Sequence, residues 1–588
     1  MTRDEIDSRY KWKLEDIFET DDAWEEEYKE TEEMLPELEA LKDDLTEDAE
    51  HLLSGLKLIY SAQFHMERLF VYAMMRRDED AKVSKYQAQV SRAQSLAVRM
   101  QSATAYLNPL LLSLSDEKMD SFINDPLLKD YSFELDKIRR NKDHILSEKE
   151  EKLLSGVGEF AGGPQEIFGM LNNADIDFGT VEYKGEKYPL SHAAYLEYLQ
   201  NDDRDLRKLV FDQYYGAFKS HVNTIAATYS NSVKKDVFYA KARNYGSSME
   251  SELFYDDVPL DVYDDLIENV HRNLDTMYEY VDIRKKALGL DDIQMYDIYV
   301  PLADAEKYKY SFEDAKDMVL SALGVLGDDY IEVLKTAFTD RWIDVYETPG
   351  KRSGAYSWGV YGTHPYVLLN HREDLDSVFT VAHELGHAMH TYYSNSTQPY
   401  SKAEYVIFVA EVASTVNEIL LTKHLLRTTE DPELKKYVLN HYIDQFRTTV
   451  LRQTMFAEFE KWSHDQLEKG NALTADSLNE EYLRLNSLYY GDTMGKDTTI
   501  QYEWARIPHF YNAFYVYKYA TGFSCAAAIV NKIENDPSMI GRYRDFLRAG
   551  GSKFPLDILR DAGIEVGEAV DLCMKEFRGA LEEYKKLI

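Results

Sequence analysis

The chain has 588 residues, more than one compact core usually serves, so the sequence predicts two or more lobes. Hydrophobic residues make up 44% of it, which excludes a disordered chain. The formal net charge of −38 repels phosphate backbones and therefore argues against a nucleic-acid partner.

The sequence carries no signal for secretion or membrane insertion. Its opening, MTRDEIDSRYKWKLEDIF, has no apolar run after its charges, so no signal peptide is expected. No stretch of about 18 apolar residues occurs, so no membrane span is expected. The cysteines, Cys525 and Cys573, are too few for a disulfide framework or a cysteine-based zinc site. The sequence predicts a cytoplasmic protein.

Most of the chain shows the hydrophobic period of α-helices. Apolar residues recur at three- and four-residue spacing between charges in 23–45 (AWEEEYKETEEMLPELEALKDDL) and 84–114 (SKYQAQVSRAQSLAVRMQSATAYLNPLLLSL). Only 14 prolines and 28 glycines interrupt the chain, few enough for long helices. The expected fold class is therefore mainly α.

Two segments have the pattern of β-hairpins. In 180–190 (TVEYKGEKYPL), β-prone residues alternate around Lys184 and Gly185, a short turn signal. In 354–370 (GAYSWGVYGTHPYVLLN), Tyr, Trp and Val alternate with small residues, and Gly362 marks a turn. We therefore expect a small β-sheet or hairpin element beside the helices.

A soft boundary follows the first hairpin. The sequence predicts an N-terminal helical lobe over residues 1–195 and a larger C-terminal lobe over residues 196–588. The motifs that carry chemistry all lie in the larger lobe, which is therefore the expected catalytic lobe.

A pair of histidines four residues apart lies in FTVAHELGHAMHTYY, residues 379–393. On a predicted helix over 376–393, His383 and His387 project from one face, so their ring nitrogens can share one metal ion. Glu384 lies about 100° around the helix and can reach a water on that metal without binding it. Zinc lowers the pKa of such a water to about 7, and a nearby carboxylate can take its proton. The alternative is an amphipathic helix with incidental histidines.

Further features of this helix bear on the site. Asp376 or Ser377 is the expected N-cap. Gly386 lies in mid-helix, where a glycine costs about 1 kcal/mol relative to alanine. It would let another backbone or a substrate come close, with loose packing as the alternative. His364 and His390 are expected to be structural or to support the ligands.

A third ligand is predicted at Glu411, which interrupts the apolar helical segment 404–421 (EYVIFVAEVASTVNEILL). A carboxylate in such a run is costly to bury unless it is paired or binds a metal. The segment should pack against the histidine helix and point Glu411 at the rings, and a buried Lys or Arg partner is the alternative. Glu418, on the same face, either orients a ligating histidine or is a surface charge.

These residues match a known family. HELGHAMH, with 23 residues between its His387 and the Glu411 of EVAS, resembles the thimet oligopeptidase family of gluzincins, within it the oligoendopeptidase F branch. The resemblance extends over nearly the whole chain. It is carried by YKWKLEDIFETDDAWEEE, GKRSGAYSWGVYGTHPYVLLNH, RIPHFYNAFYVYKYATG and GGSKFPLDILRDAGIEV.

The resemblance implies a large, mostly helical protein with a deep channel that encloses the metal and admits only short, unfolded oligopeptides. It implies His383, His387 and Glu411 as ligands of one Zn²⁺ ion per chain, and Glu384 as the general base. It also implies that PHFYNAFYVYKY supplies groups that hydrogen-bond the oxyanion and the peptide backbone.

This last segment also fits the chemistry of amide hydrolysis, because a donor aimed at the developing oxyanion contributes about 3 to 4 kcal/mol. His509 matches the family's histidine. Tyr511, Tyr515 and Tyr519, spaced by four, are expected on one helical face, with Tyr517 pointing elsewhere. We favour Tyr515 as the oxyanion donor and expect Tyr511 and Tyr519 to bind substrate; ordinary helix packing is the alternative for each tyrosine.

Upstream, SGAYSWGV is predicted to form a sheet edge at the cleft. An extended peptide could pair with this edge by strand addition, with Tyr356 on the strand and Gly354 keeping the approach flexible. A purely structural hairpin is the alternative.

The sequence therefore predicts a cytoplasmic zinc endopeptidase of oligopeptides. One rival is an exopeptidase, which would need a cation such as Arg352 or Arg506 to hold a terminal carboxylate. The other rival is a non-catalytic peptide-binding or metal-storing protein, against which the presence of Glu384 argues.

Overall fold

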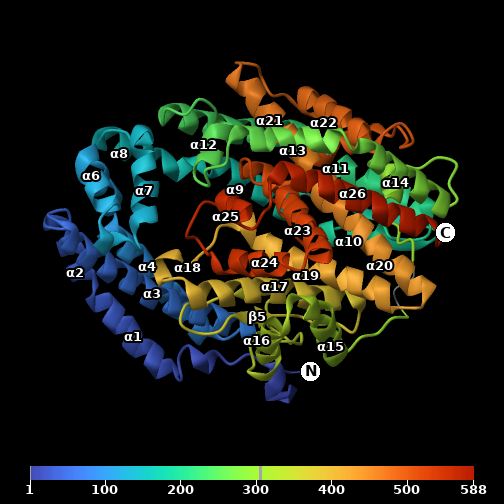
Figure 1. The fold of residues 1–588 in the computed structure, drawn as a ribbon. Coiled ribbons are helices and arrows are strands. Elements are labelled where there is room, and N and C mark those ends of the chain that lie inside the picture. Colours follow the sequence, from blue (N-terminus) through green and yellow to red (C-terminus); the bar gives the residue numbers. More distant parts are fainter. Residues whose placement is uncertain (1, 304–306) are drawn as a thin grey trace. The chain divides into compact units, whose positions relative to one another are not determined.

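The computed structural model describes residues 2–303 and 307–588. Helices dominate it, and the strands form one two-stranded and one three-stranded sheet (Figure 1). The prediction of a mainly α fold with a small β element is confirmed.

The chain divides into two compact units, and each is described by itself. The first unit consists of Met1–Asp143, Glu306–His424 and Lys532–Gly563, and the second of His144–Ala305, Leu425–Asn531 and Ile564–Ile588. The units are thus interleaved along the chain, whereas the sequence predicts a single boundary after residue 195. That lobe division stays a prediction.

The helices of the first unit include the following: α1 (Asp21–Glu33), α2 (Leu35–Ala40), α3 (Ala49–Glu79), α4 (Ser84–Thr104), α5 (Leu107–Leu112), α6 (Asp116–Ile123), α7 (Ser132–Arg140), α15 (Phe312–Leu323), α16 (Asp328–Thr339), α17 (Leu375–Thr397), α18 (Tyr400–Ala403), α24 (Met539–Arg548) and α25 (Pro555–Asp561). Helix α19 (Ile407–Thr428) lies mostly in the first unit.

The helices of the second unit include the following: α8 (Glu148–Ala161), α9 (Gly163–Met170), α10 (His192–Tyr198), α11 (Arg204–Ala242), α12 (Ser248–Phe254), α13 (Leu260–His271), α14 (Leu274–Ala287), α20 (Pro432–Gln445), α21 (Arg452–Glu468), α22 (Ala475–Tyr490) and α26 (Val566–Lys585). Helix α23 (Tyr517–Asn535) lies mostly in the second unit.

In the first unit, α17 packs against α15, α24 and the strands β4 (Tyr356–Trp358) and β5 (Tyr366–Leu368) (Figure 1). β4 and β5 are antiparallel, which confirms the predicted hairpin. A third strand, β3 (Ile343–Asp344), pairs with β5 in parallel, so β4 is an edge strand. The sequence gives no signal for β3, because two residues cannot show an alternating pattern.

In the second unit, the predicted hairpin consists of β1 (Thr180–Tyr183) and β2 (Glu186–Pro189), paired antiparallel. Its turn residues Lys184 and Gly185 have φ values of 51° and 86°. Two positive φ values are typical of the type I′ turn, whose twist matches that of the strands. The prediction of this hairpin is also confirmed.

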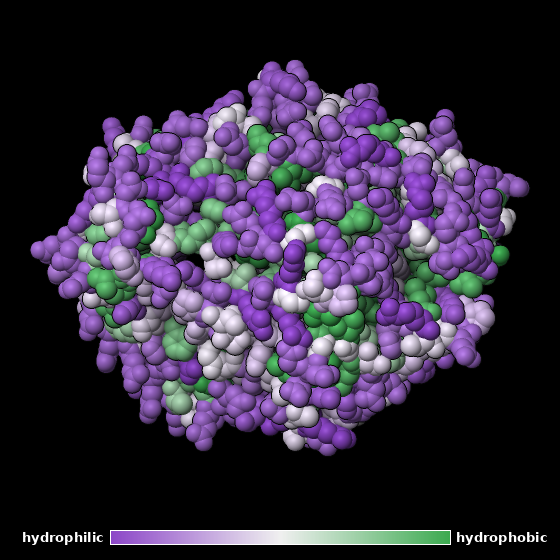
Figure 2. Space-filling model, viewed as in Figure 1, coloured by the Kyte–Doolittle hydropathy of each residue, from purple (hydrophilic) through white to green (hydrophobic). Residues whose placement is uncertain are grey.

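The surface fits the charged composition. The face shown in Figure 2 is mainly hydrophilic, with hydrophobic residues scattered over it. Across residues 2–303 and 307–588, no helix is both long enough and apolar enough to span a bilayer.

Candidate active site

Helix α17 carries the histidine pair and begins one residue earlier than predicted. Its N-cap is Asp374, whose carboxylate accepts a 2.8 Å hydrogen bond from the backbone N–H of Ser377. Ser377 cannot be the cap, because its hydroxyl instead accepts a bond from the N–H of Arg372 at 3.0 Å. The helix also continues four residues beyond the predicted end, to Thr397.

Helices α17 and α19 meet backbone to backbone at Gly386. A Cβ atom on this glycine would lie 2.5 Å from Cα of Ser414 and 2.7 Å from the carbonyl oxygen of Ala413. Nearby, the Asn417 amide on α19 donates a 3.0 Å bond to the carbonyl of Ala382 on α17. The glycine therefore permits a close approach of two helices, and loose packing does not explain it.

This contact brings the three predicted ligands together. The Nε2 atoms of His383 and His387 are 3.2 Å apart, and Oε2 of Glu411 lies 3.6 Å from each. Ligand atoms about 2.1 Å from a tetrahedral zinc ion are separated by about 3.4 Å. The donor types and the spacing therefore fit a metal ion. The ion pairs of Glu411 in the described part of the chain are with these histidines, as predicted, and not with Lys or Arg.

Glu418 fixes the orientation of one ligand. Its Oε1 lies 2.5 Å from Nδ1 of His383, so Nδ1–H donates to the carboxylate and Nε2 faces the other ligands. Burial alone lowers the pKa of His383, but the hydrogen bond and charge of Glu418 outweigh it and raise this pKa to about 9. Burial lowers the pKa of His387 to about 4, and the neighbouring positive charge of His383 adds to the shift.

Glu384 follows His383 on α17 and is 7% exposed. Burial raises the pKa of its carboxyl to about 7. The side chain is therefore a carboxyl group in a poorly solvated position, one residue from a predicted metal ligand.

The other nearby histidines are packed against neighbours. The His390 ring stacks on Tyr405 with centroids 3.7 Å apart, and burial lowers its pKa to about 3. The His364 ring stacks on Trp342 at 5.2 Å, and its Nε2 lies 3.1 Å from a carboxylate oxygen of Asp16. These contacts agree with the expected structural roles.

The predicted substrate-binding strand lies in the same unit as the ligands. Gly354 has a φ of +83°, and its carbonyl accepts a 2.7 Å bond from the Asn370 amide. The Tyr356 hydroxyl donates to the Asp78 carboxylate at 3.0 Å, which leaves the backbone of edge strand β4 as the group open to pairing. Arg352 also pairs with Asp78, at 3.2 Å.

His509 and the predicted tyrosines belong to the second unit. The rings of His509, Tyr515 and Tyr519 form a cluster, with centroids 5.5 to 6.5 Å apart. Tyr511 is not part of it, because its ring stacks on Phe168 at 4.4 Å and the residue is 4% exposed. Tyr517 is fully buried, as expected for a residue that points elsewhere.

The prediction of one helical face for these tyrosines is wrong. Pro508–Tyr511 is a short 3₁₀ helix, and α23 begins only at Tyr517. Between them, Phe514 has a left-handed φ of 51°, and its N–H donates a 2.8 Å bond to Oε1 of Glu460. Glu460 is fully buried, and the sequence interpretation missed its role because this contact spans 54 residues.

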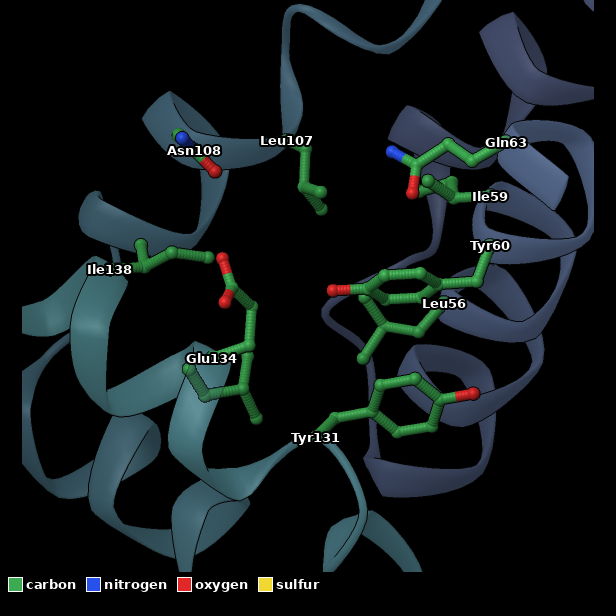
Figure 3. Close-up of a pocket in the computed structure, with 10 residues that line it drawn as sticks. Leu56, Ile59, Tyr60, Gln63, Leu107, Asn108, Tyr131, Glu134 and Ile138 are labelled. Atoms are coloured by element: carbon green, nitrogen blue, oxygen red, sulfur yellow. The ribbon is translucent and has the colours of Figure 1, made fainter. Parts of the chain in front are cut away.

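A separate cavity of about 160 Å³ lies in the first unit. Figure 3 shows Tyr60 of α3 and Glu134 of α7 directed toward each other across it. None of the predicted site residues lines this cavity.

Comparison with known proteins identifies the family. Residues 197–575 match the model of Peptidase family M3, and residues 111–178 match that of Oligopeptidase F. Oligopeptidase PepF from Bacillus subtilis is 42% identical over 100% of this chain and 88% of its own length. Group B oligopeptidase PepB from Streptococcus agalactiae is 37% identical over 100% of this chain and 98% of its own.

Solved structures agree. The structure of a Chlamydophila abortus protein has a TM-score of 0.94 and 35% identity, with 100% of both chains covered. Oligoendopeptidase-F from Enterococcus faecium has a TM-score of 0.74 and 34% identity, with 96% of this chain and 99% of that chain covered. The predicted family is thereby confirmed: the chain belongs to peptidase family M3 and is a metallo-oligopeptidase of the oligoendopeptidase F type.

Proposed function

We propose that the chain is a cytoplasmic, zinc-dependent endopeptidase that hydrolyses internal bonds of short, unfolded oligopeptides. The observation that carries this proposal is the triangle of two imidazole nitrogens and one carboxylate oxygen, with Glu384 beside it on α17. The metal holders are His383, His387 and Glu411, with one ion per chain.

Zinc is favoured by the ligand types and by their near-tetrahedral spacing. Cobalt and manganese also accept imidazole and carboxylate ligands, so they are the competing ions in a preparation. When bound, the metal supplies Lewis acidity to the hydrolysis.

The chain's own residues carry out the proton transfers and hold the ligands in place. Glu384 takes a proton from the attacking water and then passes it to the leaving amine, which is the role of a general base followed by a general acid. Glu418 holds the His383 ring in one orientation through Nδ1. A Glu384→Ala chain would keep all three metal ligands and lose the proton acceptor.

His509 and Tyr515 are the proposed donors to the developing oxyanion, because the structure clusters their rings and both carry an N–H or O–H group. Gly354, Tyr356, Tyr511 and Tyr519 are the proposed peptide-binding residues. Tyr356 and Tyr511 would act through their backbones, since both rings are packed against neighbours.

The test is hydrolysis of a fluorogenic peptide of about ten residues, a length suited to an enclosed pocket, that is blocked at both ends. Wild type is compared with Glu384→Ala at equal metal content, and with Glu373→Ala as a control at an exposed carboxylate just before α17. Internal cleavage that is lost in Glu384→Ala alone supports the proposal. Cleavage only of peptides with a free terminus would support an exopeptidase, and stable peptide binding without cleavage would support a non-catalytic binder.

A further inference from the structure

The interior of the second unit carries an excess of buried positive charge near Tyr299. Arg284 is 0% and Arg447 4% exposed, and a guanidinium keeps its charge at every working pH. A buried charge needs a counter-charge or a complete set of hydrogen bonds. The carboxylates and acceptors that surround these arginines therefore decide whether the site is complete.

Local backbone geometry gathers the charged groups. The segment Phe446–Leu451 (η10), which contains Arg447, is a π-helix, and Arg452 follows it as the first residue of α21. Thr498–Arg506 (η11) is a 3₁₀ helix, in which residues three apart eclipse, so Glu503 and Arg506 also share a side.

Glu503 is shared by two arginines. Its Oε1 accepts from Nη2 of Arg452 at 2.6 Å and from Nη2 of Arg506 at 3.1 Å. Its Oε2 accepts from the Tyr482 hydroxyl at 2.6 Å. One negative charge therefore faces two positive charges.

Asp444, like Glu503, is one negative charge that faces two arginines. It accepts from Nε of Arg447 at 3.2 Å and from the Tyr280 hydroxyl at 2.6 Å, and the charge of Arg284 also acts on it. Arg284 itself donates to the carbonyl of Val300 at 2.5 Å, which neutralises no charge.

Among residues 2–303 and 307–588, no carboxylate other than Asp444 and Glu503 forms an ion pair with these four arginines. Asp297, the buried acid closest in sequence to Tyr299, already pairs with Arg204 at 2.9 Å and with Arg207 at 2.7 Å. Within the described part of the chain, the two carboxylates that face the cluster, Asp444 and Glu503, thus neutralise only two of its four guanidinium charges.

Several N–H groups of these arginines also have no acceptor among the described residues. They are Nη1 of Arg447, Nε and Nη1 of Arg284, and Nε of Arg506. Buried donors of this kind are normally satisfied by a protein group, water or an ion.

Tyr299 connects the two carboxylate-centred groups. The Cζ atom of Arg447 lies 5.3 Å from its ring centroid, and its hydroxyl interacts electrostatically with Arg452 and Arg506. Tyr299 is half-buried, so it also lies at the edge of the cluster that an ion could enter.

We propose that a small monovalent anion binds in the second unit beside Tyr299, held by guanidinium N–H groups of Arg447 and Arg506. An inorganic halide and the terminal carboxylate of a peptide share this chemistry and are its two sources. The surface charge of the chain cannot produce such binding, because a net charge of −38 repels anions from the surface. Binding would therefore be saturable and specific to this cluster.

The test is thermal unfolding of the metal-loaded wild-type protein in sodium chloride and in sodium gluconate, at equal ionic strength. Gluconate carries the same charge on a much larger ion than chloride, so it controls for the effect of ionic strength alone. We expect Tm to rise with chloride along a saturation curve and to stay flat with gluconate. Equal, unsaturable responses to both salts would overturn the proposal.

Crystals grown in bromide provide a second measurement on wild type, and a strong anomalous peak beside Tyr299 is expected. Arg447→Gln should abolish the chloride-dependent Tm shift, while Arg92→Gln, which removes a half-exposed arginine paired with Glu25, should retain it. A bromide peak elsewhere, with an unchanged shift in Arg447→Gln, would contradict the assignment.

The source of the anion is resolved by peptide binding to Glu384→Ala, an arm that rests on the proposed function. Tighter binding of a free-acid peptide than of its amide, with the difference lost in added chloride, would assign the site to a peptide carboxylate. Equal binding of both peptides alongside a chloride-dependent Tm would assign it to an inorganic ion. If Glu384→Ala binds no peptide, the result counts against the proposed function. The anion site is then tested by the chloride and bromide measurements alone.

Discussion

The carboxylate of Glu418 on α19 lies 2.5 Å from Nδ1 of His383 on α17. When the ring is neutral, as a metal ligand must be, the contact selects the tautomer in which Nε2 carries the lone pair on the side of His387 and Glu411. A residue two turns beyond the third ligand on α19 therefore sets the direction of the first ligand on α17.

Glu418→Gln should weaken metal binding by about 10- to 100-fold, because the amide removes the charge that orients the ring and raises its basicity. Competition with a chelator measures the affinity directly. Glu373→Gln, at an exposed position before α17, is the matched control and should leave the affinity unchanged. An unaltered affinity in Glu418→Gln would mean that the helix contact alone orients His383.

Gly386→Ala should destabilise the first unit and lower its metal content, because the added Cβ would lie 2.5 Å from Cα of Ser414 and force α17 away from α19. A loss of stability in Gly386→Ala would indicate the close contact, because alanine in an open helical position stabilises a protein by about 1 kcal/mol relative to glycine. Gly541→Ala on α24 meets nothing within 4 Å and should not destabilise. Thermal unfolding and metal analysis of both variants check this; equal stability of the two would exclude the close contact.

Glu503 should make the second unit sensitive to acid. Burial raises the pKa of this carboxyl, but Arg452 and Arg506 outweigh burial and lower it to about 2. A lowered pKa contributes stability that is present above the unfolded value of 4.5 and is lost as pH falls from there toward 2. The loss is about 3 kcal/mol at 1.36 kcal/mol per pKa unit.

Urea unfolding between pH 3 and pH 6 tests this. Glu503→Gln should be less stable than wild type at pH 6. Its free energy of unfolding should also fall less steeply between pH 6 and pH 3, the acid limb of the plot of stability against pH. Glu480→Gln, at an exposed position on α22, should retain the limb. An acid limb that survives in Glu503→Gln would assign the transition to other carboxylates.

Glu460 should support the segment that carries His509 and Tyr515. Glu460→Leu removes the acceptor for the N–H of Phe514, and leaving this buried donor unpaired costs about 1 to 3 kcal/mol. Burial raises the pKa of Glu460, so the neutral Glu460→Gln keeps the acceptor and should preserve both kcat and the fold. Peptide hydrolysis by the two variants measures the difference.

The pH dependence gives a second readout for Glu460. A raised carboxyl pKa means that the folded protein holds the proton, so stability falls as pH rises above the unfolded value of 4.5. Glu460→Gln cannot lose this proton. Its stability relative to wild type should therefore increase between pH 5 and pH 8, and a constant difference would show that Glu460 is ionised in the fold.

Much of the fold follows from local sequence patterns. The apolar period predicts the helices that carry His383 and Glu411, and the turn at Lys184 and Gly185 predicts the first hairpin. The interleaving of the two units was not predictable, because contacts between distant segments leave no local period. The break before α23 was missed for the same reason, since the contact between Phe514 and Glu460 spans 54 residues.

The candidate site likewise contains residues that local sequence patterns predict and residues that they do not predict. Spacing alone predicts His383, His387 and Glu384 as site residues, because one helix carries all three. Glu411 follows from a charge in an apolar helix, and the structure brings it to the histidines. The arginines around Tyr299 were not predicted as a cluster, because their contacts join residues far apart in the sequence, as between Arg452 and Glu503, 51 residues apart.

Because α17 and α19 touch through their backbones at Gly386, the polypeptide itself gathers the three ligands. Small zinc domains differ, since they fold only when the metal binds. Here the first unit would fold first and acquire its ion afterwards. A site formed in advance accepts whichever ion of suitable chemistry reaches it first, so the metal in purified protein would reflect the growth medium as well as the ligands.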